Sequence, residues 1–211
     1  MAGREISGPD GADENLFNGA VYAICPSPTA EKFAQKYVVD LAEAMGAKPY
    51  FVGPDEHDIY VAGISHLPFM LSIGLMNTTA NNPAWREMSM LAASGYRDIS
   101  RLASGDPIMH RDICLTNQEG IVYWIDETIK QLYEFRNNIR DNPNELELSF
   151  IRAWESRARW LAHKESGAAP GVEFPSSSDT MMSLLMGDKL ATRLKELTEE
   201  RARDQTKYHK G

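Results

Sequence analysis

The sequence predicts a mainly α-helical protein, with a bundle of helices preceded by a short β-α-β remnant of an α/β domain. Two observations carry this prediction. Segments rich in strand-favouring residues occur only before Pro54. After that proline, long segments repeat apolar residues at helical spacing, and prolines or capping residues precede several of them.

The β-α-β region comes first. Residues 19–25 (GAVYAIC) favour a strand that stops at the following proline, and residues 49–52 (PYFV) favour a second, short buried strand. Between them we expect a helix with Thr29 as its N-cap and Gly46 in the left-handed conformation that ends it. Its apolar stripe comprises Phe33, Tyr37, Leu41 and Met45. One such unit cannot bury both faces of its sheet, so we expect it to be the last piece of a larger α/β domain.

The helical region follows and divides into segments with recognisable starts. We expect helices over about 55–76, from Asn82-Pro83 to before Gly95, from a capping box at 116–119, from Asn142-Pro143, and from about Asp179 to a charged tail. The stretch between the last two is expected to be a linker. The predicted domains are therefore 1–53 (α/β remnant), 54–165 (helical domain) and 166–211 (linker and last helix).

The apolar stripes of the long helices are broad and include Trp124, Trp154 and Trp160. A small bundle buries less hydrophobic surface than these stripes offer, which favours a homodimer with interleaved helices. A monomer with a thick core is the alternative.

Charge and composition exclude some classes of function. The formal net charge of −8 argues against a nucleic-acid binder and against adhesion to an acidic membrane surface. The longest apolar run, residues 59–76, is interrupted by His66 and Pro68, which predicts that it is too polar to span a membrane. The N-terminal residues lack the apolar core of a signal peptide. With Cys25 and Cys114 expected to be reduced, these features predict a cytoplasmic protein.

The helix expected over 55–76 contains two histidines. His57 and His66 lie nine residues apart, on opposite sides of a straight helix, so they are not a metal-binding pair. Pro68 removes the hydrogen bond to the carbonyl of Ile64 and should open the helix there. A freed carbonyl beside His66 and Ser65 makes a candidate ligand site. The alternative for His66 is a core histidine bonded to a backbone carbonyl, and His57 is expected to be structural.

A second polar cluster spans residues 95–113 (GYRDISRLASGDPIMHRDI). Arg97 and Arg101 are four residues apart and can project from one face of a helical turn. Small residues follow Arg101 and would let a ligand approach its guanidinium, which suits a carboxylate. A solvated connector held by salt bridges is the alternative.

Four motifs in order resemble the prephenate/arogenate dehydrogenase family of tyrosine biosynthesis. They are MAGREISG at the start, HD at 57–58, SHLP at 65–68, and the cluster at 95–113, followed by Asn117 and a long helix. The resemblance covers about 1–161. It implies a Rossmann-type NAD(P)-binding domain joined to a helical domain that dimerises, with the substrate between them. The implied reaction is oxidative decarboxylation of a cyclohexadienyl acid, a small anionic ring compound.

The resemblance also implies roles for residues. Arg101 matches the arginine that holds a substrate carboxylate, and His66 matches a histidine on the helical side of the cleft. Glu5 and Ser7 match the segment just after the catalytic histidine, and Ser65 and His110 complete the candidate substrate-binding set. No catalytic residue and no metal ligand is assigned.

Departures from the family pattern shape the functional expectation. The family's catalytic His-Pro would precede Met1, and no Gly-x-Gly occurs, so this chain alone is expected to bind neither NAD nor NADP and to be inactive. Phe69 stands where many relatives have a second histidine, and His110 where many have tryptophan. Because of these changes, the sequence does not decide whether the substrate is prephenate, arogenate or a 4-amino analogue. The alternatives are a non-catalytic helical dimer that keeps a carboxylate pocket as a sensor or interaction module, and another dehydrogenase type with a helical second domain.

Overall fold

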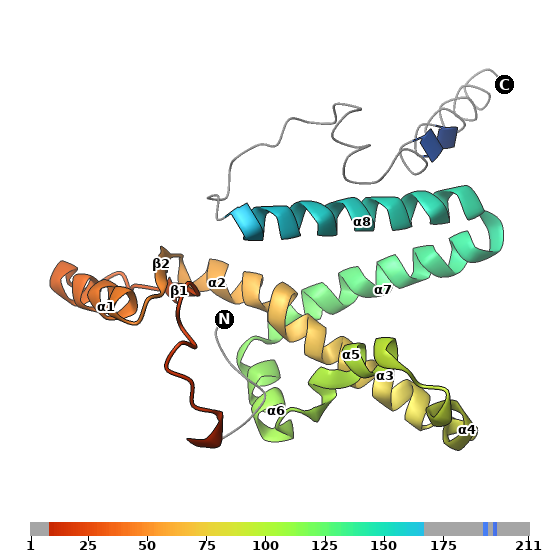
Figure 1. Ribbon diagram of the computed structural model, residues 1–211, viewed down its shortest axis with the longest axis horizontal. Helices are drawn as coiled ribbons and strands as arrows, with labels where there is room; N and C mark the ends of the chain where they lie inside the picture. The colour runs from red at the N-terminus through yellow and green to blue at the C-terminus, as the bar shows by residue number, and fades with distance from the viewer. Residues whose placement is uncertain (1–8, 167–191, 194–195, 198–211) are drawn as a thin grey trace. The chain divides into compact units, whose positions relative to one another are not determined.

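The computed structural model describes residues 9–166, 192–193 and 196–197 (Figure 1). These residues are mainly helical and include one two-stranded sheet, so the predicted fold class is confirmed. The chain divides into two compact units, 1–128 and 129–211, and the division falls inside one long helix. The predicted domain boundaries at 53 and 165 stay predictions. Glu5, Ser7, the predicted linker and the start of the predicted last helix lie outside the described residues.

The first unit begins with the β-α-β segment. After the 3-10 turn η1 (Pro9–Gly11) come strand β1 (Val21–Ile24), helix α1 (Lys32–Ala44) and strand β2 (Lys48–Phe51). The strands are parallel, with register from Val21 opposite Lys48 to Ile24 opposite Phe51. A helical crossover is what a parallel pair requires.

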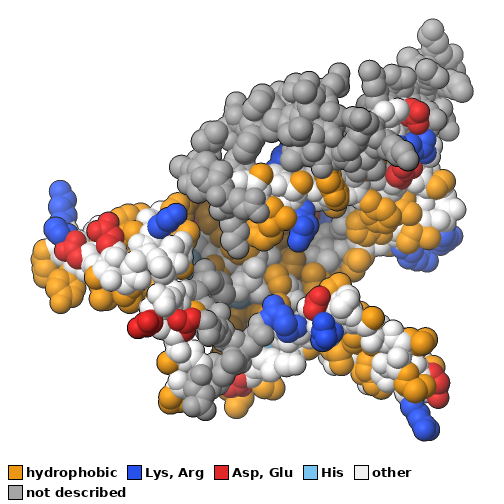
Figure 2. Space-filling model, viewed as in Figure 1, with side chains coloured by type: hydrophobic (Ala, Val, Ile, Leu, Met, Phe, Trp, Pro, Cys, Tyr) orange, Lys and Arg blue, Asp and Glu red, His pale blue; other side chains and the backbone are white. Residues whose placement is uncertain are grey.

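The ends of α1 only partly follow the prediction. Gly46 has φ of +75° as expected, which favours glycine at this position. Thr29 is not the N-cap, because Glu31 holds that position in extended conformation. The predicted stripe is largely uncovered in the single chain, with Phe33 72% and Tyr37 74% exposed. Figure 2 shows apolar side chains on the visible surface at α1.

A long helical rod follows the sheet. It consists of α2 (Pro54–Val61), a π-helical turn η2 (Ala62–His66) and α3 (Leu67–Ala80). In η2 the N–H of Leu67 donates to the carbonyl of Ala62, five residues earlier. Pro68 comes directly after and has no N–H to give. The interruption expected near this proline is therefore present, and its form is a π-helical turn.

By length and composition alone, the rod Pro54–Ala80 could cross a membrane, and 17% of its most apolar window is buried in this chain. The expectation that this run is too polar for a span is therefore wrong by that criterion. Apolar helices of soluble proteins pass the same criterion.

Short helices come next: α4 (Trp85–Met90), α5 (Ser94–Ser100), the 3-10 turn η3 (Arg101–Ser104) and α6 (Pro107–Thr116). The prediction of one helix from Asn82 to before Gly95 is wrong. Helix α4 is a short piece that begins at Trp85, after a turn in which the N–H of Trp85 donates to the carbonyl of Asn82 at 2.9 Å. The Asn82 side chain accepts the N–H of Ala84 at 2.9 Å, as an N-cap residue does. Helix α5 packs on α3, where the Tyr96 hydroxyl lies 2.6 Å from that of Thr79.

Two long helices complete the described chain, α7 (Gln118–Asp141) and α8 (Pro143–Ser166). The start of α8 after Asn142 is as predicted. The capping box at Thr116 is wrong, because this residue ends α6 and its hydroxyl donates to the carbonyl of Asp112 within that helix. In the second unit, Leu148, Ile151 and Leu197 form a buried cluster.

Candidate functional site

The π-helical turn η2 lies directly against the start of α7. A Cβ on Gly63 would come within 2.7 Å of the Trp124 indole, and one on Gly120 would come within 3.1 Å of the Cβ of Ala62. Ala62 is fully buried and Ile121 is 3% exposed. Glycine on each helix therefore allows the close backbone approach that places η2 and α7 together.

Two side chains from the α6–α7 region bond to carbonyls of α2 just before η2. The indole N–H of Trp124 donates to the carbonyl of Ile59 at 3.0 Å, and the amide of Asn117 donates to the carbonyl of Asp58 at 2.7 Å. The N–H of Ala62 also reaches both carbonyls, and a carbonyl oxygen has two lone pairs, so each can accept a side-chain donor in addition. These bonds fix the position of η2.

His66 is the last residue of this turn and is partly buried. Its Nδ1 lies 3.4 Å from the amide nitrogen of Asn117, and its ring centroid is 6.0 Å from that of Phe69. Burial lowers the pKa of His66 below its ordinary value, Asp58 opposes this shift, and the neighbouring His57 adds to it. His66 is therefore held as a neutral imidazole near pH 7. The described contact of its Nδ1 is with a side chain, and the alternative of a core histidine bonded to a backbone carbonyl stays untested.

His57 and Asp58 form a pair of their own, with the His57 Nδ1 3.0 Å from a carboxylate oxygen of Asp58. This contact between neighbours on α2 fits the structural role expected for His57.

The turn that carries Arg101 is fixed to α3. The hydroxyl of Ser72, which is 1% exposed, accepts the N–H of Ala103 at 2.9 Å. Arg101 is the first residue of η3 and lies at the surface. Arg97, four residues earlier, pairs with Asp98 at 3.8 Å, as the alternative of a salt-bridged connector predicts for this part.

The two departures from the family pattern contact each other. The rings of Phe69 and His110 are stacked, with centroids 4.3 Å apart and planes 7° from parallel. A Cβ on Gly105 would lie 2.6 Å from the His110 ring, so glycine leaves the space that this ring fills. Phe69 is 5% exposed. The stack therefore joins α3 to α6 beside the turn that carries Arg101.

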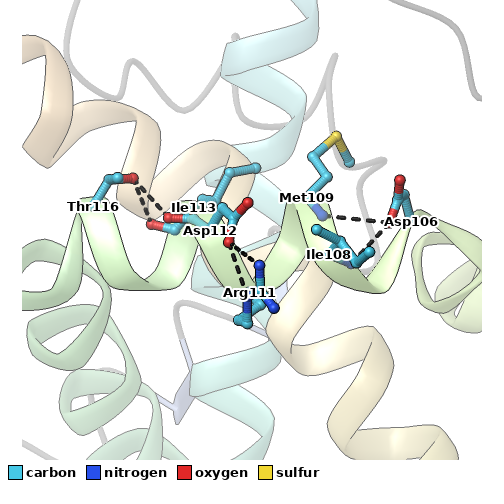
Figure 3. Close-up of polar contacts among 7 residues, drawn as sticks. All are labelled: Asp106, Ile108, Met109, Arg111, Asp112, Ile113 and Thr116. Carbon is cyan, nitrogen blue, oxygen red and sulfur yellow. Dashed lines mark hydrogen bonds and ion pairs between the residues drawn. The ribbon is translucent and has the colours of Figure 1, made fainter.

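Polar contacts run along α6, the helix that carries His110 (Figure 3). Asp106 caps the helix by accepting the N–H of Ile108 at 2.7 Å. Arg111 pairs with Asp112 through two nitrogens, at 2.9 and 2.7 Å. Asp106 and Asp112 therefore make contacts within this segment, and Asp98 pairs with Arg97. Arg101 stays the predicted ligand-binding cation of the cluster.

The structure brings part of the predicted site together. The rings of His66, Phe69 and His110 form a row, and Ser65 lies partly buried beside His66. That Arg101 and His66 converge on one ligand stays a prediction. The sequence analysis missed three residues that form this site: Asn117, Trp124 and Ser72. The only signal for any of them as a site residue was that Asn117 follows the fourth family motif. No group of three or more metal-ligating side chains occurs among the described residues.

The turn between β1 and α1 shows how well this segment suits a dinucleotide. It contains Pro26 and Pro28 but no glycine, and Glu31 is the N-cap of α1. A pyrophosphate needs glycine for close backbone approach and amide groups at the helix start, and a carboxylate there would repel it. This turn therefore lacks the features of a phosphate-binding first turn, as expected for the last β-α-β unit of a larger α/β domain.

Comparisons with known proteins agree with the motifs. Residues 53–153 match the family model of the prephenate dehydrogenase dimerization domain. Prephenate dehydrogenase of Bacillus subtilis is 30% identical over 171 residues, which cover 81% of this chain and 46% of that protein. Cyclohexadienyl dehydrogenase of Zymomonas mobilis is 26% identical over 166 residues, covering 78% of this chain and 56% of that protein. The chain spans about half the length of the curated relatives it matches.

Solved structures give the same result. Synechocystis arogenate dehydrogenase superposes with a TM-score of 0.67 at 29% identity, over 75% of this chain and 59% of that one. Prephenate dehydrogenase of Aquifex aeolicus, in complex with hydroxyphenyl propionate and NAD+, gives 0.69 at 27% identity, over 76% of this chain and 57% of that one. Motifs, family match and fold agree, and the chain belongs to the prephenate and arogenate dehydrogenase family, with the family's dimerization domain at residues 53–153.

Proposed function

We propose that this chain supplies the substrate-binding and dimerisation part of a prephenate or arogenate dehydrogenase. The reaction is the NAD(P)-dependent oxidative decarboxylation of a cyclohexadienyl acid in tyrosine biosynthesis. One observation carries the proposal: the family match over 53–153 contains both the π-helical turn with His66 and the α3-bound turn with Arg101. The oxidoreductase names of the relatives support it.

Within this proposal the chain's residues bind and orient the substrate. The Arg101 guanidinium pairs with a ring-acid carboxylate, since its planar fork matches two carboxylate oxygens. His66 contributes a neutral imidazole, and Ser65 a hydroxyl beside it. His110 presents a ring edge from its stack on Phe69, and Glu5 completes the candidate set. Aromatisation of the ring supplies the driving force, and the protein supplies orientation.

The homodimer belongs to the same proposal. The matched domain is named for dimerisation, and several large apolar side chains on α2, η2 and α7 are exposed in the single chain. Examples are Ile64 at 78%, Ile129 at 57% and Leu132 at 55% exposed. A second copy that covers these side chains would remove them from water. We place the protein in the cytoplasm, with no nucleic acid and no membrane as partners.

NAD or NADP would be the hydride acceptor of the complete reaction. The 211 residues contain no Gly-x-Gly, the core of the phosphate-binding turn, so we propose that they alone bind neither form and show no turnover. Adding NAD+ or NADP+ and prephenate to the purified chain, and following the absorbance of the reduced cofactor, tests this. Steady turnover contradicts it.

Calorimetry tests the substrate site, with hydroxyphenyl propionate as the probe. Arg101→Ala should weaken binding by about 30- to 1,000-fold, since a lost charged hydrogen-bond pair costs on the order of 2–4 kcal/mol. Arg97→Ala is the matched control, because Arg97 precedes Arg101 by one helical turn and already pairs with Asp98. Equal affinities for the two variants would refute Arg101 as the carboxylate partner.

A non-catalytic dimer that keeps the pocket predicts the same binding. The genomic sequence upstream separates the two functions. An in-frame His-Pro preceded by a Gly-x-Gly-x-x-Gly segment supports the dehydrogenase.

A further inference from the structure

We propose that Asn117 is a positioning residue, which holds His66 as a hydrogen-bond donor through Nε2 toward the acidic ligand. The ligand part of this inference rests on the proposed function. The part that concerns the imidazole rests on the contacts of Asn117 alone. Asn117 lies at the junction between α6 and α7, 51 residues along the chain from His66.

The orientation of the Asn117 amide follows from its partner on α2. Its nitrogen lies 2.7 Å from the carbonyl oxygen of Asp58, and a carbonyl can only accept. The group pointing at Asp58 is therefore the NH2, and the carbonyl oxygen of the amide points elsewhere. The usual ambiguity between the two ends of an asparagine side chain is resolved by this bond.

The same NH2 group also faces His66. Its second hydrogen is available to the Nδ1 of the imidazole, 3.4 Å away. Nδ1 must then carry a lone pair, since two donors cannot bond to each other. In a neutral imidazole the proton is then on Nε2. Asn117 thereby selects one of the two tautomers of His66.

Neighbouring ionisable groups shift the protonation equilibrium of His66 in opposite directions. Asp58 favours the imidazolium and His57 disfavours it, while burial of the ring favours the neutral form. Protonation of Nδ1 would also place its hydrogen against the NH2 of Asn117. His66 is thus a poor proton acceptor at Nδ1 and a hydrogen-bond donor at Nε2, where a carboxylate or a ring oxygen of the ligand can accept.

The position of Asn117 is itself constrained. Its Oδ1 lies 2.7 Å from where a Cβ on Gly120 would be, so the amide occupies space that a side chain there would fill. Its backbone N–H donates to Ile113 at 3.0 Å, and its carbonyl accepts from Ile121 at 3.1 Å. The side chain therefore starts from a backbone held on both sides.

Nitrogen-15 NMR of the histidine-labelled chain tests the inference, because the two ring nitrogens have different shifts in each tautomer. Wild-type His66 should show protonated Nε2 and unprotonated Nδ1 near neutral pH. Asn117→Asp should reverse the tautomer or raise the pKa of His66, since a carboxylate accepts where the amide donated. Gln118→Glu is the control, because it makes the same chemical change at the adjacent, exposed residue.

The outcomes separate this inference from the proposed function. Wild-type His66 protonated on Nδ1, or Asn117→Asp spectra that match those of Gln118→Glu, overturns the role of Asn117 whether or not a ligand binds. His57 reports within each spectrum on general disturbance of α2. Calorimetry with hydroxyphenyl propionate then tests the ligand part, with a loss on the order of tenfold expected for Asn117→Asp and none for Gln118→Glu. If the tautomer is confirmed but Asn117→Asp and Gln118→Glu bind the acid with equal affinity, His66 is not a hydrogen-bond donor to the ligand. If the wild-type chain does not bind the acid at all, the proposed function is wrong.

Discussion

Gly63→Ala tests the contact between the π-helical turn and α7. The new Cβ would lie 2.7 Å from one carbon of the Trp124 ring and 3.0 Å from two further ring atoms, closer than carbon atoms approach in proteins. The ring cannot swing aside without loss of its hydrogen bond to Ile59, at 3.0 Å. One of the two helices must therefore shift, or the bond must break.

The size of the effect follows from opposing terms. Overpacking costs about 1–3 kcal/mol, and a broken hydrogen bond adds about 1 kcal/mol. Alanine is favoured over glycine in a helix by about 0.5–1 kcal/mol, which offsets part of the loss. We expect a net destabilisation of about 1–3 kcal/mol. With a typical dependence of about 2 kcal/mol per molar urea, the unfolding midpoint should fall by about 0.5–1.5 M.

Gly74→Ala on α3 is the matched control. A Cβ there meets nothing within 4 Å in the described part of the chain, so only the helix-propensity term remains. This variant should be more stable than wild type, by up to about 1 kcal/mol. Both are measured by urea unfolding at one fixed protein concentration, because a dimer's stability depends on concentration. Equal stability of the two variants, or Gly63→Ala as the more stable one, would show that the close approach of η2 to Trp124 is wrong.

Three further predictions concern the neighbouring contacts. Ser72→Ala should cost about 1–3 kcal/mol, because the part-buried N–H of Ala103 loses its acceptor on buried Ser72, whereas exposed Ser89→Ala should change little in the same urea assay. Gly105→Ala should displace the His110 ring, now 2.6 Å from the added carbon, and the NMR shifts of that ring, caused by its stack on Phe69, should change. Burial lowers the pKa of His66 below its ordinary value of 6.5, so the unfolded chain binds more protons just below that pH. Stability should therefore fall as pH drops through 6.5, and His66→Gln should reduce this slope; an unchanged slope refutes the assignment.

The order and type of most elements could be predicted from the sequence, because their causes are local. The proline at 54, the Asn142-Pro143 pair and the glycine at 46 each act on the backbone within a few residues. The interruption near Pro68 was predicted for the same reason. Its form was not, since a π-helical turn depends on which carbonyls find other donors.

The errors arose where two local patterns compete. Thr116 has the spacing of a capping box, yet its hydroxyl bonds back to Asp112 and so ends one helix instead of starting another. Asn82 followed by proline has the pattern of a helix start, and its side chain does accept the N–H of Ala84 as an N-cap would. The backbone there forms a turn closed by the N–H of Trp85, and α4 starts after it. Short-range spacing alone does not distinguish these arrangements.

Contacts between residues far apart in the chain could not be predicted from the sequence, for a different reason. Asn117 and Trp124 reach carbonyls 59 and 65 residues earlier in the chain, and neither distance follows from any periodicity. Both contacts require η2 and α7 to lie close together, and Gly63 on η2 and Gly120 on α7 leave the space for this approach. The two glycines and the two side-chain donors therefore stabilise the same contact between η2 and α7. The proline interrupts the regular helix, and the glycines let a second helix approach it. Asn117 and Trp124 bond to carbonyls of α2, and Asn117 also contacts the imidazole of His66. A change to any of these parts should disturb His66 through its contact with Asn117, so tautomer and stability measurements on the glycine variants should move together.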